Sequence, residues 1–537
     1  MNRIYKVIYS KAHQCYVVVS ELAKRNHKSS QSSIDHSTPA LARVIAMALT
    51  AGALTWGSTP GISWAADNTA GSGAGVAVGT GSSAPKAENV AIGKGATIKY
   101  SNGESKSTGD VAVGSGAVID NYASQGGSIA IGKNAIVNNM TGKQESLFAL
   151  GQTQYHSGNW LGTLQIPNNP ENVAGSIAIG DNTYARTGSV MIGSHNYRGR
   201  IGDQTVDTSK TNTYGININA TTLGTNSFNQ GAFSSVTGAY SIISGKYDGS
   251  GFSSYGVQNF GATITGSLNS IESATSSSIY SGIANSIVGT ANRTFNSNGS
   301  LIFGAGNTIN NSVTDITNAK DDFLGNDVLD LSNTKSAKNL QDELMTTVHN
   351  NKSGGATLII GGGNVADYTQ KTQILGVNNT VTGTESNISD YNMIDGFGNT
   401  ITGASHLYTI GTNNKISNTK NTILAGDDYT NVSGLTDSVI IGNNRVKGDE
   451  KAEFAYFNNQ KNIVSIGNKN VLDSTDGSIS IGNNNFMWRS GGQPEKYGYD
   501  TGNVAIGNNT YINSYLNQGD SIVIGANCQA KCNTFEK

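Results

Sequence analysis

The chain has 537 residues with 68 Gly and only 6 Pro, which excludes collagen because no strict Gly-X-Y period occurs. Its regular apolar alternation also excludes a simple disordered tail. The formal net charge is −2, and basic residues outnumber acidic ones in residues 1–65, so the rest of the chain is mildly acidic. A mildly acidic surface argues against nucleic acid as a partner.

Residues 1–65 have the pattern of a targeting segment. The apolar run Val44–Trp56 has the length of a signal-peptide h-region and is too short to span a bilayer. Small residues at Ser63 and Ala65 predict cleavage after Ala65 or Ala66. We therefore expect the mature chain to be exported.

The segment before this apolar run is much longer than an ordinary n-region. Its sequence, in particular residues 1–9 and 15–23, closely resembles the extended signal peptide region of large Gram-negative type V secreted proteins. The resemblance covers residues 1–30. It implies Sec-dependent export to the periplasm and delivery to the outer surface.

A short phrase recurs from Gly75 almost to the end of the chain. Two β-branched residues flank a small residue and a glycine ends the run, most clearly in Ser128–Gly132 and Ser176–Gly180. The alternation predicts a strand and the glycine predicts a corner. Successive glycines such as Gly79 and Gly93 recur about every 15 residues, which fits two short strands and two turns, or one rung of a parallel β-roll.

Asparagine often follows this glycine two residues later, and asparagine tolerates left-handed turns. We expect these side chains to form ladders between rungs; they are Asn134, Asn182, Asn226, Asn378, Asn413, Asn444, Asn484, Asn509 and Asn527. The flanking Ile129 and Ile131 are expected to point into the roll and Ala130 to point outward. Because the outward residue is small and apolar, we expect a second chain to pack against it.

The phrase and its Asn-rich turns resemble the head repeat of YadA-like trimeric autotransporter adhesins. The resemblance covers residues 75–527 and is weakest from 200 to 300. It implies an all-β fold, namely a left-handed parallel β-roll of about 15-residue rungs with three chains side by side. It also implies adhesion to host or bacterial surfaces.

One stretch departs from the rung pattern. Residues 315–348 are rich in charge, and Ala337, Leu340, Leu344 and Val348 share one helical face, which predicts a short helix on the side of the roll. Two smaller inserts, around 160–167 and 454–457, are expected to be side loops. We divide the chain into an extended signal peptide region (1–30), an h-region and cleavage site (31–65), a first repeat array (66–304), an insertion with an amphipathic helix (305–356), a second array (357–527) and a polar tail (528–537).

Residues that could carry chemistry are few. Adjacent Asp427 and Asp428 would point to opposite faces of a strand and are expected to form a solvated turn. Cys528 and Cys532 lack the further ligands that a metal site requires, and a disulfide between them stays open. Gly361–Asp367 lacks the second glycine and the Asp spacing of a calcium repeat. We expect no catalytic, cofactor-binding or metal-binding residues and no enzyme.

No sustained heptad repeat occurs, and the last strand-like copy ends at Gly525. The family usually adds a coiled-coil stalk and a membrane anchor. We expect a truncated gene or fragment, a passenger released into the medium, or a partner that supplies the anchor.

The predicted function is an exported adhesin head that displays many weak contacts at the cell surface or outer membrane. Its expected partners are two further copies of the chain and an extracellular matrix protein, a host surface glycan or a bacterial surface. A secreted β-helical carbohydrate-active enzyme and a structural biofilm component are the alternatives.

Overall fold

The computed structural model describes residues 5–10, 15–20, 70–100, 109–121, 126–139, 144–146, 163–165, 175–186, 188–196, 219–229, 231, 233–245, 259, 261–273, 281–313, 338, 341–342, 345, 357–430, 432–443, 457–473, 475–490, 500–515 and 520–531. The chain divides into two compact units, Met1–Ala66 and Asp67–Lys537. The first contains an antiparallel hairpin of β1 (Tyr5–Ser10) and β2 (Cys15–Ser20). The predicted h-region and cleavage site lie outside the described residues.

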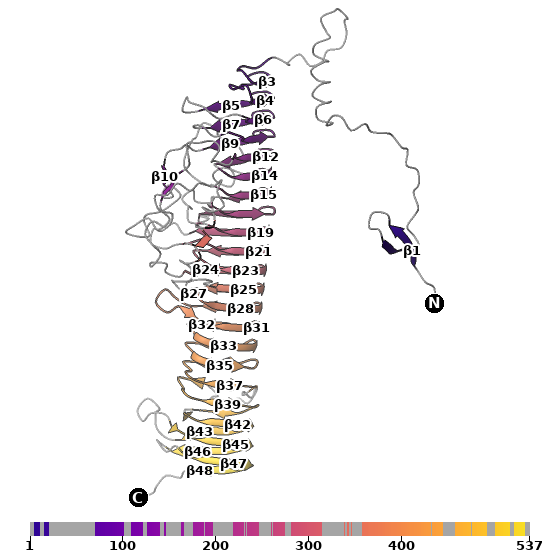
Figure 1. Ribbon diagram of the computed structural model, residues 1–537. Coiled ribbons are helices and arrows are strands. Elements are labelled where there is room, and N and C mark those ends of the chain that lie inside the picture. The colour runs from indigo at the N-terminus through magenta and orange to yellow at the C-terminus, as the bar shows by residue number, and fades with distance from the viewer. Residues whose placement is uncertain are drawn as a thin grey trace, which may run out of the picture. The chain divides into compact units, whose positions relative to one another are not determined.

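The second unit is a parallel β-solenoid in which each copy of the phrase forms one strand of a continuous ladder (Figure 1). This first sheet runs in the order β3 (Val76–Val78), β4 (Val90–Ile92), β6 (Val111–Val113), β8 (Ile129–Ile131), β12 (Ile177–Ile179), β14 (Val190–Ser194), β15 (Thr221–Thr225), β17 (Ser235–Thr237), β19 (Thr263–Ser267), β21 (Ser286–Thr290), β23 (Leu301–Ala305), β25 (Thr357–Gly362), β28 (Thr372–Val377), β31 (Met393–Phe397), β33 (Ser405–Thr412), β35 (Lys420–Ala425), β37 (Val439–Ile441), β39 (Val464–Ile466), β42 (Ile479–Asn483), β45 (Val504–Asn508) and β47 (Ile522–Ala526).

A second column of strands follows the corner of each rung. Its first ladder contains β5 (Thr97–Tyr100), β7 (Val118–Asn121), β9 (Ile136–Asn139) and β13 (Tyr184–Arg186). Its second contains β16 (Phe228–Asn229), β18 (Ile242–Gly245), β20 (Ser270–Ser273), β22 (Arg293–Phe295), β24 (Thr308–Asn310), β26 (Val365–Asp367), β29 (Thr380–Thr382), β32 (Thr400–Thr402), β34 (Lys415–Ser417), β36 (Val432–Ser433) and β38 (Phe457–Asn458). Its third contains β40 (Val471–Leu472), β43 (Phe486–Ser490), β46 (Tyr511–Tyr515) and β48 (Gln529–Lys531).

Short strands form a third side in the later rungs. They are β27 (Thr369–Gln370), β30 (Ser389–Asp390), β41 (Thr475–Asp476) and β44 (Asp500–Thr501). Apart from these, β10 (Gln144–Ser146) and β11 (Thr163–Gln165) form a separate antiparallel pair. Every pairing between rungs is parallel and in register, so equivalent residues stack in columns. The predicted parallel β-roll is therefore confirmed.

The corner after each phrase explains the glycine. Gly361 has φ +141, and a Cβ placed there would lie 1.7 Å from the carbonyl oxygen of Gly376 in the next rung. Only glycine tolerates both this angle and this approach. The expected left-handed asparagines are also confirmed among the described residues, and the Asn484 side chain donates to Asn509 Oδ1 at 2.7 Å.

The predicted orientation of the phrase is wrong. Ala130 is 0% exposed and lies inside the roll, whereas Ile131 is 38% exposed and points outward. The reason is the opposite strand of the rung, which already fills the interior with Ile98, Ile119 and Val137. In these earlier rungs the small Ala130 side chain packs against them, because the interior is close-packed.

The interior changes composition along the roll. The earlier rungs combine Ala from the first sheet with larger residues from the second. The later rungs place Ile on both sides, for example Ile359, Ile374, Ile394 and Ile401. Beside this core runs a column of buried asparagines that the sequence did not reveal: Asn269, Asn292, Asn307, Asn364, Asn379, Asn399 and Asn414.

The roll continues through parts of the predicted inserts. Strand β24 lies in the 305–356 segment and pairs with β26, and Phe457, expected in a side loop, lies in β38 and pairs with β36. In the predicted helix, the described residues Lys338, Gln341, Asp342 and Met345 are helical, whereas its apolar face lies outside the described residues. Within the residues that the structure describes, no helix is long and apolar enough to cross a membrane.

Candidate functional site

The outward side chains of the first sheet form two parallel columns, which we call the outer rows. Row one holds the first residue of each phrase: Val76, Val90, Val111, Ile129, Ile177, Val190, Thr221, Ser235, Thr263, Ser286, Leu301, Leu358, Gln373, Met393, Tyr408, Ile423, Val439, Val464, Ile479, Val504 and Ile522. Row two holds the third residue: Val78, Ile92, Val113, Ile131, Ile179, Ile192, Leu223, Thr237, Thr265, Val288, Phe303, Ile360, Leu375, Asp395, Ile410, Ala425, Ile441, Ile466, Ile481, Ile506 and Ile524.

The outer rows are apolar over two long stretches. Every described member is exposed or half-buried, and Ile410 and Ile524 remain 57% and 65% exposed. Between residues 221 and 286 the rows are mostly Ser and Thr. An apolar ribbon that continues over many rungs is far larger than the isolated apolar side chains of an ordinary surface, and such patches mark interaction sites.

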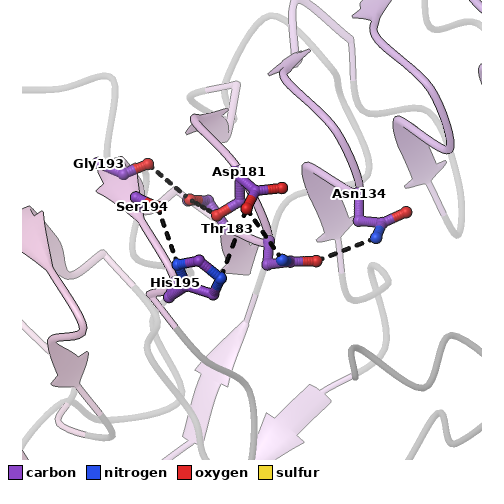
Figure 2. Close-up of polar contacts among 7 residues, drawn as sticks. Asn134, Asp181, Thr183, Gly193, Ser194 and His195 are labelled. Atoms are coloured by element: carbon purple, nitrogen blue, oxygen red, sulfur yellow. Dashed lines mark hydrogen bonds and ion pairs between the residues drawn. The ribbon is translucent and has the colours of Figure 1, made fainter. Parts of the chain in front are cut away.

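A polar cluster forms at one corner of the earlier rungs (Figure 2). His195 has a left-handed backbone with φ 53, its Nδ1 lies 2.9 Å from Ser194 Oγ, and its Nε2 lies 3.4 Å from Asp181 Oδ2. Asn182 donates to the same Asp181 oxygen at 3.2 Å and accepts from Asn134 at 3.0 Å. The cluster therefore joins three successive rungs.

This Ser–His–Asp order resembles the hydrogen-bond order of a hydrolase, so its chemistry requires examination. A nucleophilic serine requires donors for the developing oxyanion near the hydroxyl. Thr183 and Ser194 lie at the ends of neighbouring strands. The Thr183 hydroxyl, however, already donates to the Gly193 carbonyl oxygen at 3.0 Å. The His195 and Asp181 side chains are 36% and 40% exposed, so water screens their interaction. The geometry is that of a solvated corner ladder.

A second cluster, the Lys371 cluster, comprises Lys371, Tyr391 and His406 on three successive rungs. The Lys371 amine donates to Tyr391 Oη at 2.6 Å and lies 4.6 Å from the centre of the Tyr391 ring. The Tyr391 and His406 rings stack at 4.6 Å with an interplanar angle of 11°. All three residues have left-handed backbones, which cost about 1–2 kcal/mol each outside glycine and asparagine. Asn421 occupies the equivalent corner one rung later.

An aromatic cluster covers the outer side of the second column near its C-terminal end. Phe486 and Tyr511 stack at 5.6 Å, Trp488 Nε1 donates to Tyr511 Oη at 2.8 Å, and Lys531 Nζ lies 5.5 Å from the Tyr511 ring. Because the rings stack along the ladder, they turn their edges rather than their faces outward. The cluster adds cross-rung packing where the strands lengthen.

An ion pair joins two rungs of the second column. Arg293 donates to both Glu272 carboxylate oxygens at 2.8 Å, and the Glu272 side chain is buried. The hydrogen bond with Glu272 raises the pKa of Arg293, which burial alone would lower. Arg293 also lies over the Phe295 ring at 5.3 Å. The paired hydrogen bonds therefore hold β22 on β20.

The polar residues that the sequence pointed to lie at the surface of the roll or outside the described residues. Asp427 and Asp428 lie in an exposed corner, where Asp427 Oδ1 accepts from the Thr412 amide at 2.8 Å. Cys528 is a free thiol and Cys532 lies outside the described residues. Over the described ranges, no group of three or more His, Cys, Asp or Glu side chains could hold a metal ion. Neither corner cluster is apparent in the sequence, because rung lengths vary and the columns are visible only once the rungs are aligned.

Comparison with known families bears on the N-terminus. A model described as the Extended Signal Peptide of Type V secretion system matches residues 1–50. The chain carries a type V secretion signal. This signal supports export by type V secretion to the cell surface or outer membrane and supports an autotransporter-type protein. A search of curated proteins found no match.

Proposed function

We propose that the chain is the adhesive head of a surface protein similar to the YadA-like trimeric autotransporter adhesins, and that its rolls associate side by side through the outer rows. The observation that carries this proposal is the apolar ribbon, exposed over both ends of a roll that follows a type V export signal. Three rolls that turn these ribbons toward one axis would remove them from water. The favourable term is about 25 cal/mol per Å² of apolar surface buried.

Adhesion would then be multivalent. A rod built from stacked rungs displays equivalent surfaces many times, so weak contacts to a matrix protein, a glycan or another bacterial surface add through effective concentration. The loops that leave the roll are the natural places for specificity, because loops tolerate variation better than the ladder does. We propose that the head acts by binding and not by catalysis.

The test of association uses the exported, processed chain in light scattering coupled to size-exclusion chromatography. We expect a trimer. Replacing Ile410, Ile441 and Ile481 together by Ser should convert the trimer to monomer while circular dichroism stays unchanged. Thr380→Ser, on the outward side of β29, is the matched control and should remain trimeric. A monomeric wild-type chain would refute the proposal.

The test of adhesion measures retention of the trimer on immobilised matrix proteins, on glycan arrays and on co-resident bacteria. Binding to one of these surfaces, lost in the monomeric variant, supports the adhesin. Stable trimers that bind none of them favour a purely structural surface component. Release of reducing sugar from polysaccharides would favour the carbohydrate-active enzyme instead.

A further inference from the structure

One charged residue interrupts the outer rows. Asp395 lies in row two between Leu375 of the preceding rung and Ile410 of the following rung. It is the only charged side chain among the described members of both rows. It is exposed, and within the described part of the chain its carboxylate has no ion pair. A carboxylate buried between rolls would be costly unless a cation met it there.

A cation lies at the opposite edge of the same sheet. Each member of the Lys371 cluster stands two residues before a member of row one, so the cluster lines the edge next to row one. Asp395 belongs to row two, on the other edge. The Lys371 amine lies over the ring of Tyr391, one rung further along, and Tyr391 leads directly into β31. The amine is therefore displaced toward the rung that carries Asp395.

The symmetry of a closed ring brings these two edges together. In a cyclic assembly each copy contacts the next through two different patches, so the row-one edge of one sheet meets the row-two edge of its neighbour. A pure rotation contains no shift along its axis, and each rung therefore faces the same rung of the next copy. The occupant of the Asp395 edge is then a second copy of this chain, presenting its Lys371 cluster.

We propose that Asp395 of one copy pairs with Lys371 of the neighbouring copy, and that this contact fixes the direction and rung register of the association. The inference rests on the proposed function, because it requires rolls that associate through the outer rows. Charge complementarity supports it: Asp395 has no ion pair within the described residues, and the Lys371 amine on the opposite edge reaches Tyr391 of the same rung. A slip along the roll would move the carboxylate away from the Lys371 amine, which gives the interface its specificity.

The pair accounts for the composition of the cluster. Lys371, Tyr391 and His406 all occupy left-handed corners where Asn421 and Asp437 occur later in the same column. Asparagine would be the less strained choice at each of these three positions. The stack holds the amine at one level through a hydrogen bond and a ring contact, and the exposed His406 imidazole extends the same edge. Strained residues persist where a specific arrangement requires them.

The experiment is a charge exchange in the full exported chain. Asp395→Lys and Lys371→Glu should each lower the association constant at least tenfold, and the double variant should restore most of it. Glu385→Lys and Lys415→Glu change the same charges at exposed positions outside the outer rows and should have no effect. Circular dichroism and thermal unfolding will verify that each monomer is folded.

Mixed assembly gives a second readout. Chains carrying both exchanges should associate with one another but form few mixed trimers with differently tagged wild-type chains. The pair would be overturned if the single variants associated like wild type, or if the double variant did not recover association. In either case a trimeric wild type would leave the proposed function intact. A monomeric wild type would overturn both.

Discussion

The side-chain amide of Asn364 donates to Asn307 Oδ1 at 3.0 Å, although 57 positions separate the two residues in the chain. The same Asn307 oxygen accepts the Asn364 backbone amide at 3.0 Å. The ladder therefore closes across the long 314–356 segment as if adjacent rungs followed directly. The column of buried asparagines is therefore continuous in space, although its members are far apart in the sequence.

This column should be a main source of stability in the later rungs. Asn364→Ala removes the donor to the Gly376 carbonyl oxygen at 2.8 Å and the acceptor for the Asn379 amide at 2.9 Å. Two buried groups lose their partners, so we expect a loss of about 3 kcal/mol in unfolding free energy. Denaturant unfolding measures it. Asn378→Ala, at the adjacent exposed corner, should cost only about 1 kcal/mol, and equal losses would contradict the role of the column.

The glycine corners provide a matched pair. Gly93 has φ +126 and a Cβ there would lie 2.5 Å from the Gly114 carbonyl oxygen, whereas a Cβ at Gly95, with φ +69, meets nothing within 4 Å. Gly93→Ala should therefore destabilise the roll by at least about 2 kcal/mol more than Gly95→Ala does. Thermal unfolding of the two variants decides this. Similar melting temperatures would mean that the rungs separate easily at this corner.

The orientation of the phrase is directly testable. Ala130→Arg places a charge inside the roll and should cost more than about 4 kcal/mol. Ile131→Arg, one residue later and outward, should leave the monomer folded and weaken only association. Circular dichroism separates the two effects. A folded Ala130→Arg monomer would instead indicate that Ala130 points outward.

Asp476 makes stability depend on pH. Burial raises the pKa of its carboxyl, opposed by the Lys461 amide that donates to Oδ1 at 3.0 Å and by the Lys461 amine at 4.0 Å. Because the folded-state pKa exceeds the unfolded one, Asp476 favours folding at low pH and loses this contribution as pH rises through the folded pKa. Asp476→Asn keeps an acceptor for the Lys461 amide. It should be more stable than wild type at pH 7, and the difference should disappear in acid unfolding series.

The Ser194–His195–Asp181 corner separates a catalytic role from a structural one. If the cluster is a corner ladder, His195→Asn should keep the unfolding free energy within about 0.5 kcal/mol, because asparagine suits a left-handed corner. Ser194→Ala should leave adhesion unchanged. Labelling by a fluorophosphonate probe that Ser194→Ala abolishes would instead indicate a nucleophilic serine.

The sequence was sufficient to predict the rung, but it did not predict which side chains of the phrase point into the core. Alternation in residues such as Ile129–Ile131 defines two faces, but it does not say which face meets the core. That depends on the strand across the rung, where Ile119 and Val137 already fill the interior. In the earlier rungs, a comparison of side-chain volumes in the two strands contained the signal, because Ala in one strand packs against larger residues in the other.

The two asparagine columns show the same limit. The sequence predicts Asn378 as a turn residue, and it is indeed left-handed. The residue after it, Asn379, turns inward and donates to Asn364 Oδ1 of the preceding rung. Local propensity predicts the left-handed turn, because that turn depends on the backbone of one residue. The inward hydrogen bond depends on how rungs stack, which local propensity does not describe. The corner clusters depend on stacking as well and were missed for this reason.

The continuous in-register ladder has a mechanical consequence for a protein held at a surface under flow. Bonds between rungs run along the stack, so tension on the two ends loads the rungs in series and the weakest one opens first. Each rung of about 15 residues then releases roughly 50 Å of chain in place of about 4.8 Å of stacked height. Such a rod would yield in small steps and dissipate force before its contacts break.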